Sequence, residues 1–248
     1  MLVRVSILIP PSAKYMFIVI FCRGFVKTIY IFGFVCYHVQ AMEFNYQKQL
    51  DKEIEKLKGK RPTLLLHSCC GPCSSYVLEY LTRYFEVSLF WYNPNIYPQE
   101  EFNKRFQNQI KLIEEMGLAG DVQVLASPWK HDEYLKRVMG LENEPEGGDR
   151  CTECFRMRLN ATAQMAQKYK FDWFCTTLTV SPHKDAQRIN QLGEEIGRAY
   201  GVNFLPSDFK KREGYKRSTE LSRQYGLYRQ NYCGCEFSKP DDGDEPIG

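Results

Sequence analysis

Cysteine spacing constrains this chain more than any other feature of its sequence. Seven of its ten cysteines lie in three short motifs, Cys69-Cys70-Gly-Pro-Cys73, Cys151-Thr-Glu-Cys154 and Cys233-Gly-Cys235. Small disulfide-rich domains are usually shorter than about 100 residues and space their cysteines singly. Closely paired cysteines in a chain of 248 residues therefore indicate metal or redox chemistry in a reducing compartment. We expect the other three, Cys22, Cys36 and Cys175, to be small buried side chains because they lie in apolar stretches.

The first 41 residues differ in composition from the rest of the chain. They contain long apolar runs, four basic residues and no acidic residue. Three interpretations are open for this apolar N-terminal extension: a misplaced start with Met42 as the true initiator, a membrane anchor over residues 15–39, or an extension packed on the fold. Arg23 and Lys27 argue against an anchor, because a charge near the bilayer centre costs about 2.5–3.5 kcal/mol. We predict a cytoplasmic protein without membrane contact, with one catalytic domain at 42–238 and an acidic disordered tail at 239–248.

Strand-like and helix-like segments alternate after Met42. Apolar and β-branched runs predict strands at 63–67, 86–92, 122–125, 171–180 and 202–205. Helical spacing of apolar residues predicts helices at 74–84, 98–116, 132–139, 152–169 and 185–200. This alternation predicts an α/β fold with a Rossmann-like, doubly wound and mostly parallel sheet, in which ligands lie outside the carboxyl ends of the strands. After Pro206 we expect a charged, aromatic C-terminal tail that carries the last cysteine motif.

The first two cysteine motifs predict a metal centre. The CCGPC motif follows a predicted strand and opens a helix, whose N-terminus favours thiolates. Cys151 and Cys154 open another helix after a flexible Gly147-Gly148 loop. Four soft ligands from two turns fit either a tetrahedral zinc site or a [4Fe–4S] cluster, and the adjacent Cys69 and Cys70 favour the cluster because zinc ribbons use two CxxC knuckles. Cys73 is a further candidate, either as an alternative ligand or as a group that contacts the substrate or a second metal.

The third motif predicts a redox pair. A disulfide between Cys233 and Cys235 closes a small strained ring that is easily reduced, which suits two-electron transfer. Other polar groups near the predicted strand ends are candidate proton donors or hydrogen-bond partners of metal ligands: His67, Asp149, His183 and Asp185. Asp185 can instead cap the helix that follows it. Tyr92, Asn93 and Pro94 lie at another strand end, where they form a turn or line the pocket.

Four segments in register resemble the QueH-type epoxyqueuosine reductases over about residues 45–238: LLLHSCCGPCSS, DRCTECFRMRL, FCTTLTVSPHKD and NYCGCEFS. The resemblance implies a fold like that of nucleotide alpha-hydrolases. It implies two-electron reduction of the epoxide of epoxyqueuosine at the tRNA wobble position to queuosine and water, the last step of queuosine biosynthesis. It also implies a [4Fe–4S] cluster on Cys69, Cys70, Cys151 and Cys154 with an additional iron beside it, and a redox-active disulfide of Cys233 and Cys235. The implied partners are tRNA carrying epoxyqueuosine and an external electron donor.

A tRNA substrate requires a local positive surface, because the net charge does not supply one. The whole chain has 33 Lys and Arg against 30 Asp and Glu, and four of the basic residues precede Met42. The predicted tRNA-binding cluster is Lys210, Lys211, Arg212, Lys216 and Arg217, interleaved with Phe209 and Tyr215, whose rings can stack on unpaired bases. Arg156 and Arg158 are further candidates.

Two other functions fit parts of the same pattern. One is a zinc-binding module that interacts with tRNA, and the other is a thiol–disulfide oxidoreductase without an iron–sulfur cluster. A tRNA sulfur transferase is disfavoured, because CCGPC occupies the place after the first predicted strand where such an enzyme needs a Gly/Ser-rich ATP loop.

Overall fold

The computed structural model describes residues 4–8, 16–22, 25–32, 35–36 and 44–239. The chain divides into two compact units, Met1–Phe44 and Asn45–Gly248. In the first unit four strands form an antiparallel sheet in chain order: β1 (Arg4–Leu8), β2 (Met16–Cys22), β3 (Phe25–Phe32) and β4 (Val35–Cys36). None of the helices that the structure describes is long and apolar enough to cross a membrane.

Several predictions about the chain ends have no test in this structure. The burial expected for Cys22 and Cys36 falls outside the described side chains, and the tail expected at 239–248 falls outside the described residues apart from Lys239. The origin of the N-terminal extension also stays a prediction. Cys175, by contrast, is buried as expected.

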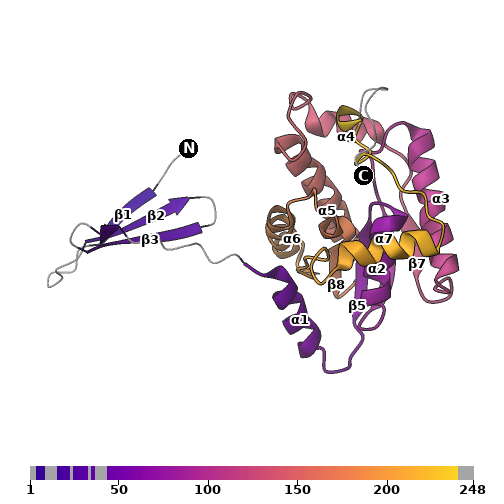
Figure 1. Cartoon of the computed structure of the whole chain (residues 1–248), viewed down its shortest axis with the longest axis horizontal. Helices are drawn as coiled ribbons and strands as arrows, with labels where there is room; N and C mark the ends of the chain where they lie inside the picture. Colours follow the sequence, from indigo (N-terminus) through magenta and orange to yellow (C-terminus); the bar gives the residue numbers. More distant parts are fainter. Residues whose placement is uncertain (1–3, 9–15, 23–24, 33–34, 37–43, 240–248) are drawn as a thin grey trace. The chain divides into compact units, whose positions relative to one another are not determined.

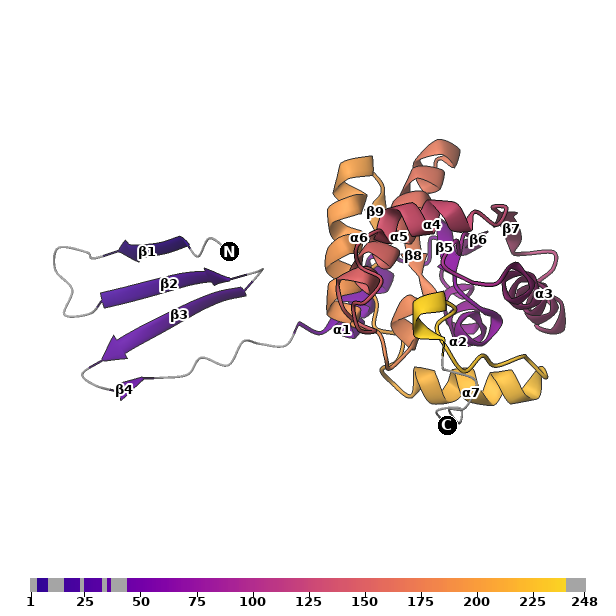
Figure 2. The same ribbon diagram turned by 90° about the horizontal axis from the view of Figure 1, so that it is seen from above.

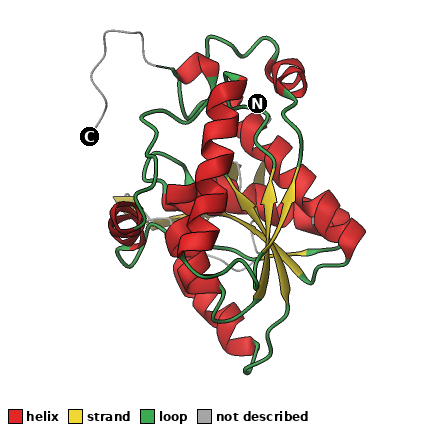
Figure 3. Ribbon diagram, turned by 90° about the vertical axis from the view of Figure 1, so that its right-hand side faces the viewer, coloured by secondary structure: helices red, strands yellow, loops and turns green. Residues whose placement is uncertain are grey.

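The second unit is built on a five-stranded parallel sheet. Its strands are β5 (Thr63–Ser68), β6 (Glu86–Trp91), β7 (Gln123–Ala126), β8 (Trp173–Thr176) and β9 (Asn203–Phe204), and their spatial order is β7-β6-β5-β8-β9. The direction of winding reverses between β5 and β8, which is where doubly wound sheets bind their ligands. The predicted Rossmann-like fold is therefore confirmed, and Figure 3 shows the sheet between its helices.

Alternate side chains of β5 belong to two separate cores. Leu64 and Leu66 pack with α2 (Gly71–Leu81) and α3 (Gln99–Glu115), and α1 (Tyr46–Lys56) adds Leu50 to the same core. Leu65 packs instead with α5 (Asp149–Tyr169) and α6 (Ala186–Tyr200). Because strand side chains alternate between the two faces, helices cover the sheet on both sides (Figure 1). A shorter helix, α4 (His131–Val138), packs against α5.

The strand predicted at 171–180 is shorter than expected. It ends at Thr176, and Thr177–Val180 form a 3-10 turn. The hydroxyl oxygen of Thr176 accepts a hydrogen bond from the N–H of Leu178, so this side chain caps the turn and ends the strand. The apolar run that suggested a longer strand is buried in the turn instead.

The predicted C-terminal tail contains a helix, α7 (Gly214–Gln224), which packs against α2 (Figure 2). Gly214 is required there, because a Cβ would lie 1.9 Å from the carbonyl oxygen of Phe209 and 2.4 Å from the Tyr76 ring. The buried residues of α7 are Gly214, Ser218, Leu221 and Ser222. A buried side made mostly of small and polar residues lacks the apolar periodicity that identifies a helix in a sequence.

Candidate metal and redox site

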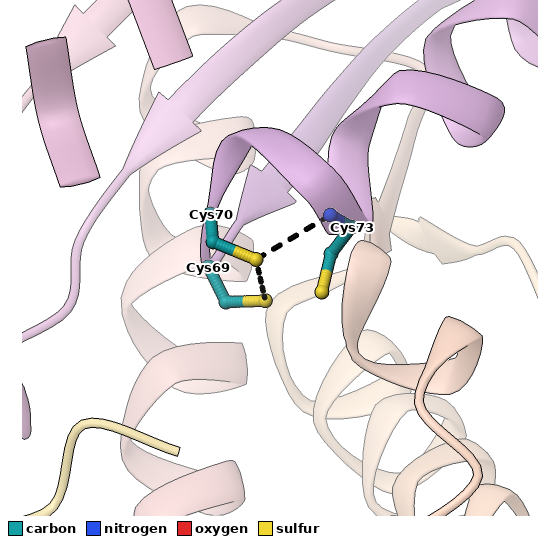
Figure 4. A group of neighbouring side chains, drawn as sticks. All are labelled: Cys69, Cys70 and Cys73. Atoms are coloured by element: carbon teal, nitrogen blue, oxygen red, sulfur yellow. Dashed lines mark hydrogen bonds between the residues drawn. The ribbon is translucent and has the colours of Figure 1, made fainter. Parts of the chain in front are cut away.

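The first cysteine motif caps helix α2. Cys70 is the N-cap residue, and its Sγ accepts a hydrogen bond from the N–H of Cys73 at 3.4 Å. Gly71 allows close contact with α3, since a Cβ would lie 2.9 Å from the side-chain nitrogen of Asn108. The turn collects the sulfurs of Cys69, Cys70 and Cys73 within 4.8 Å of one another, and Figure 4 shows them converging. We call these three residues the cysteine turn; they can hold a soft metal ion.

Cys69 is the most acidic thiol of the cysteine turn. Its Sγ lies 3.9 Å from that of Cys70 and 3.5 Å from the hydroxyl of Thr177. Hydrogen bonding with Cys70 and Cys73 holds the pKa of Cys69 well below its usual range. Burial raises the pKa of Cys70 to about 12, and hydrogen bonding with Cys69 raises that of Cys73. Cys69 therefore loses its proton more readily than Cys70 and Cys73, and metal binding would deprotonate the thiols that hold the ion.

The second and third motifs meet in one pocket, which we call the cysteine pocket. Its wall contains Cys151 and Cys154 from α5 together with Cys233 and Cys235 from the C-terminal segment. Burial raises the pKa of Cys151 and raises that of Cys154 to about 11. The chain thus brings its CxxC and CxC motifs together although they are distant in sequence.

Backbone contacts fix the loop that precedes Cys151. The N–H of Gly147 donates to Cys151 Sγ at 3.2 Å, and Gly147 has a left-handed φ of 87°. Arg188 of α6 donates to the carbonyl oxygen of Gly147 at 2.6 Å and to the hydroxyl of Thr152 at 2.9 Å. The double glycine, predicted as a flexible loop, is therefore a turn that Arg188 holds in place.

The CxC motif is held by α3, by the loop that precedes α3 and by α4. The guanidinium of Arg105 donates to the carbonyl oxygen of Cys233 at 3.1 Å. The N–H of Tyr97 donates to the carbonyl oxygen of Gly234 at 2.9 Å. Gly234 has a φ of 103°, a conformation that favours glycine. The Tyr134 hydroxyl lies 2.9 Å from Cys235 Sγ. The motif is thus bound at each of its three residues.

The two thiols of the CxC motif differ in acidity. Cys233 and Cys235 are both free thiols in this structure. Hydrogen bonding between them holds the pKa of Cys233 well below its usual range and raises that of Cys235. Burial raises the pKa of Tyr134, so its phenol keeps a proton beside Cys235. Cys233 is therefore the more acidic of the two thiols, and Cys235 is the less acidic one and lies beside the Tyr134 phenol. Their redox role stays a prediction.

Two cations connect the cysteine turn with the cysteine pocket. Burial lowers the pKa of Arg158, but the negative charge of Cys154, Cys69 and Cys233 outweighs it and raises the pKa. Lys184 responds in the same way to Cys69, Cys73 and Cys233. Of the four predicted cluster ligands, Cys69 and Cys154 therefore interact with the same cation, Arg158. Among the described residues the three sulfurs of the cysteine turn are the group within 4.8 Å, and Cys151 and Cys154 stand apart.

Some of the other predicted polar residues line the cysteine pocket and some do not. Asp185 lines the pocket, and its carboxylate also accepts from the N–H of Arg188, which confirms the helix cap. His183 lines the pocket at its exposed rim. Asp149 is exposed at the start of α5 and is not part of the pocket wall. Among Tyr92, Asn93 and Pro94, none lines the pocket, whose wall contains Asn95 instead.

His67 has no access to the pocket. Its Nε2 lies 3.2 Å from the Tyr92 carbonyl oxygen, which can only accept, and its Nδ1 lies 2.9 Å from the Thr176 hydroxyl. Nε2 therefore carries the proton and Nδ1 accepts one. Burial lowers the pKa of His67 to about 3, so the ring is neutral and links two strand ends.

The predicted tRNA-binding cluster already holds acidic partners. The ion pairs are Lys210 with Asp208, Arg212 with Asp51, Lys216 with Glu213, and Arg217 with Glu79 and Glu220. Three of these cations, with Tyr76 and Tyr80, line a groove between α2 and α7, which we call the basic groove. Phe209 is buried and cannot stack on a base, whereas Tyr215 is exposed. Among the described residues Lys211 is the one cation of the cluster without an ion pair.

Two candidate functional residues, Lys184 and Tyr134, were not predicted from the sequence. Lys184 stands between His183 and Asp185, so the motif contained it without singling it out. Tyr134 carries no sequence signal beyond helical spacing. Arg158 was predicted to contact tRNA, but it is buried against the cysteines, whereas Arg156 is half-buried and pairs with Glu153 and Glu195.

Comparisons with known proteins identify close relatives. A family model described as epoxyqueuosine reductase QueH matches residues 64–241. Relatives with the same description include those of Streptococcus pyogenes serotype M1, 43% identical over 79% of this chain and 78% of its own length, and Staphylococcus epidermidis, 42% identical over 83% and 89%. The relative from Thermotoga maritima is 37% identical over 71% and 90%. A solved NH3-dependent NAD synthetase from Campylobacter jejuni aligns with 76% of this chain and 99% of its own at 11% identity and a TM-score of 0.33.

Proposed function

This chain belongs to the QueH family of epoxyqueuosine reductases, and from that premise we propose that its cysteines hold an iron–sulfur cluster and form the redox pair that serves the reaction. The protein is an oxidoreductase of tRNA processing that catalyses the last step of queuosine biosynthesis. The reaction breaks both C–O bonds of the epoxide, forms a C=C bond and releases the oxygen as water. It consumes two electrons and two protons.

The donor set supports an iron–sulfur cluster on Cys69, Cys70, Cys151 and Cys154. All four are free thiols, two at the cysteine turn and two in the cysteine pocket. Thiolates are the usual ligands of such clusters, and a bound cluster would supply electrons at low potential. Cys73 is then available to hold an additional iron beside the cluster, since its Sγ lies within 4.8 Å of the sulfurs of Cys69 and Cys70.

Cys233 and Cys235 supply the electron and proton balance of the reaction. Oxidation of two thiols to a disulfide releases two electrons and two protons, which the epoxide consumes. Tyr134 can relay a proton, because its hydroxyl lies 2.9 Å from Cys235 Sγ. His183 and Asp185 line the same pocket and are the remaining candidates for protonating the departing oxygen. An external electron donor must then reduce the disulfide.

The tRNA substrate needs cations that are free to meet phosphates. Lys211 has no described ion pair, and the Lys216–Glu213 pair is long at 3.5 Å and exposed. Exposed pairs of this kind contribute little, so a phosphate can replace the carboxylate. We therefore assign the phosphate contacts to Lys211 and Lys216, with Lys210, Arg212 and Arg217 held more closely by their acidic partners.

The proposal is carried by seven free cysteines, three in the cysteine turn and four in the cysteine pocket, and metal analysis tests it. The protein beginning at Met42, purified without oxygen, should contain about four irons per chain or more with labile sulfide. Dithionite reduction should give an S = 1/2 EPR signal that is absent in Cys151→Ala, and the native protein should reduce epoxyqueuosine in tRNA. Zinc alone, with no iron after reconstitution, would contradict the cluster and favour a zinc-bearing module.

A further inference from the structure

Three arginines are buried in the second unit, and they differ in what balances their charge. Arg105 forms an ion pair with Glu101 at 2.6 Å. Arg150 donates to the carbonyl oxygens of Leu141, Glu142 and Glu144. Arg158 donates a single described hydrogen bond, from Nε to the carbonyl oxygen of Cys154 at 3.3 Å. Arg158 is therefore the buried arginine whose charge is least satisfied by its described surroundings.

No carboxylate balances Arg158 among residues 44–239. The two acidic side chains in the pocket wall, Glu146 and Asp185, lie at its exposed rim and form no ion pair with Arg158. Arg158 lines the cysteine pocket together with Cys154 and Cys233, and the largest negative charges that act on it are those of Cys154, Cys69 and Cys233. A buried cation requires a counter-charge, so the sulfur site itself must supply it.

Lys184 repeats this arrangement from a different segment. It lies in the loop before α6, it is half-buried in the pocket wall, and no ion pair of its side chain is described within residues 44–239. The largest negative charges that act on it are those of Cys69, Cys73 and Cys233, and the carboxylate of Glu146 in the pocket wall also interacts with it. Two independent cations thus face the sulfurs that come from three distant parts of the chain.

We propose that Arg158, assisted by Lys184, is the fixed counter-cation of the metal–thiolate centre and makes that centre easier to reduce. This inference rests on the proposed function, because it assumes that the cysteines bind a metal or a cluster. One-electron reduction by a low-potential donor adds one negative charge to the centre without making or breaking a bond. A nearby positive charge stabilises the reduced state more than the oxidised state, so Arg158 is a positioning residue that acts through the sulfurs.

The reduction potential of the centre tests this role against a matched control. Arg158→Gln removes the buried charge, whereas Arg156→Gln removes a half-buried charge two residues away that pairs with Glu153 and Glu195. At the potential where native protein is half reduced, we expect Arg158→Gln to show about a tenfold lower ratio of reduced to oxidised centre, which is about 59 mV for one electron. Arg156→Gln should match native protein. Equal potentials in the two variants would overturn the proposal.

Cobalt binding provides a second measurement that needs no cluster. A tetrathiolate–Co²⁺ complex is also anionic, and its thiolate absorption band reports binding. Metal-free Arg158→Gln should bind Co²⁺ about tenfold more weakly than Arg156→Gln. If native protein takes up no iron, the proposed cluster fails, yet this difference would still support the counter-cation. Absence of the difference would reject it independently.

Two further variants keep the test decisive if Arg158→Gln does not fold. Arg158→Lys retains the charge and should keep near-native potential and Co²⁺ affinity. Lys184 lies in a loop, and Lys184→Gln should lower the reduction potential and the Co²⁺ affinity, as Arg158→Gln does, but by less. Lys168→Gln, on the exposed surface of α5, is its control. The proposal is contradicted if Lys184→Gln and a folded, uncharged Arg158 variant both keep the reduction potential of the native protein.

Discussion

The cysteine pocket and the basic groove both collect cations, but they balance them differently. In the basic groove Arg217 lies 2.6 Å from Glu79, and Arg212 and Lys216 also hold acidic partners. In the cysteine pocket neither Arg158 nor Lys184 forms an ion pair with a carboxylate among residues 44–239. A cation held closely by an acid, as Arg212 and Arg217 are, mainly supports local structure, whereas a buried cation that shares its pocket with sulfurs is matched to a negatively charged centre. The comparison indicates which positive charges serve the chemistry.

The largest expected effect is the loss of iron binding when a proposed cluster ligand is removed from the cysteine pocket. Cys154→Ala should abolish iron binding, because it removes a thiolate from the pocket side of the proposed cluster. Iron and labile sulfide per chain measure this directly. Cys175→Ala is the control, since Cys175 is equally buried but bonds to Leu205 and Ser207 away from the pocket. Retention of a full cluster in Cys154→Ala would remove Cys154 from the ligand set.

The buried pair behind the CxC motif should give the next largest effect. Arg105→Gln leaves Glu101 without its ion pair and weakens the support of Cys233, so we expect about 3 kcal/mol of lost unfolding free energy. Urea unfolding measures the loss. Arg156→Gln, at the surface of α5, should change stability by less than about 0.5 kcal/mol. Equal stabilities for the two variants would mean that Arg105 contributes no more than a surface charge.

The tRNA contacts assigned beside the basic groove predict a smaller change, visible in the salt dependence of binding. Replacing Lys211 and Lys216 together by Gln should reduce the slope of log affinity against log salt by about two, about one for each lost phosphate contact. Filter binding over a salt series measures the slope. The double variant Lys168→Gln with Lys170→Gln removes the same charge elsewhere and should leave the slope unchanged. The assignment fails if both double variants behave alike.

The smallest expected effect comes from an exposed ion pair of the groove. Arg217→Gln should lower the unfolding free energy by about 0.5–1 kcal/mol at pH 7, because the Arg217–Glu79 pair is partly solvated. The bond to Arg217 lowers the pKa of Glu79 in the folded state. Its contribution is therefore complete above the unfolded pKa of about 4.3 and is lost as the pH falls through the folded pKa. Urea unfolding should show the gap between native and variant closing below about pH 4; a gap that persists there would come from packing.

The sequence predicted most of the fold because the relevant signals are local. The α5 prediction depended on Phe155, Leu159, Ala163 and Ala166 at helical spacing, and all four are buried. The five strands lie where apolar runs predicted them, apart from the early end of β8. Helix α7 was missed because its buried side is formed mainly by glycine and serines, which carry no apolar signal.

The cysteine motifs and their family were thus determined by the sequence alone, because the spacing of a turn or a helix is set within a few residues. The environment of those cysteines was decided by the tertiary structure. Tyr134 meets Cys235 across 101 positions, and Arg105 meets Cys233 across 128. Whether a cation pairs with a carboxylate, as Arg217 does, or shares a pocket with cysteines, as Arg158 does, depends on which distant segments pack together. Charge balance is a property of packed neighbours, and so only the folded chain separates the cations of the site from those of the surface.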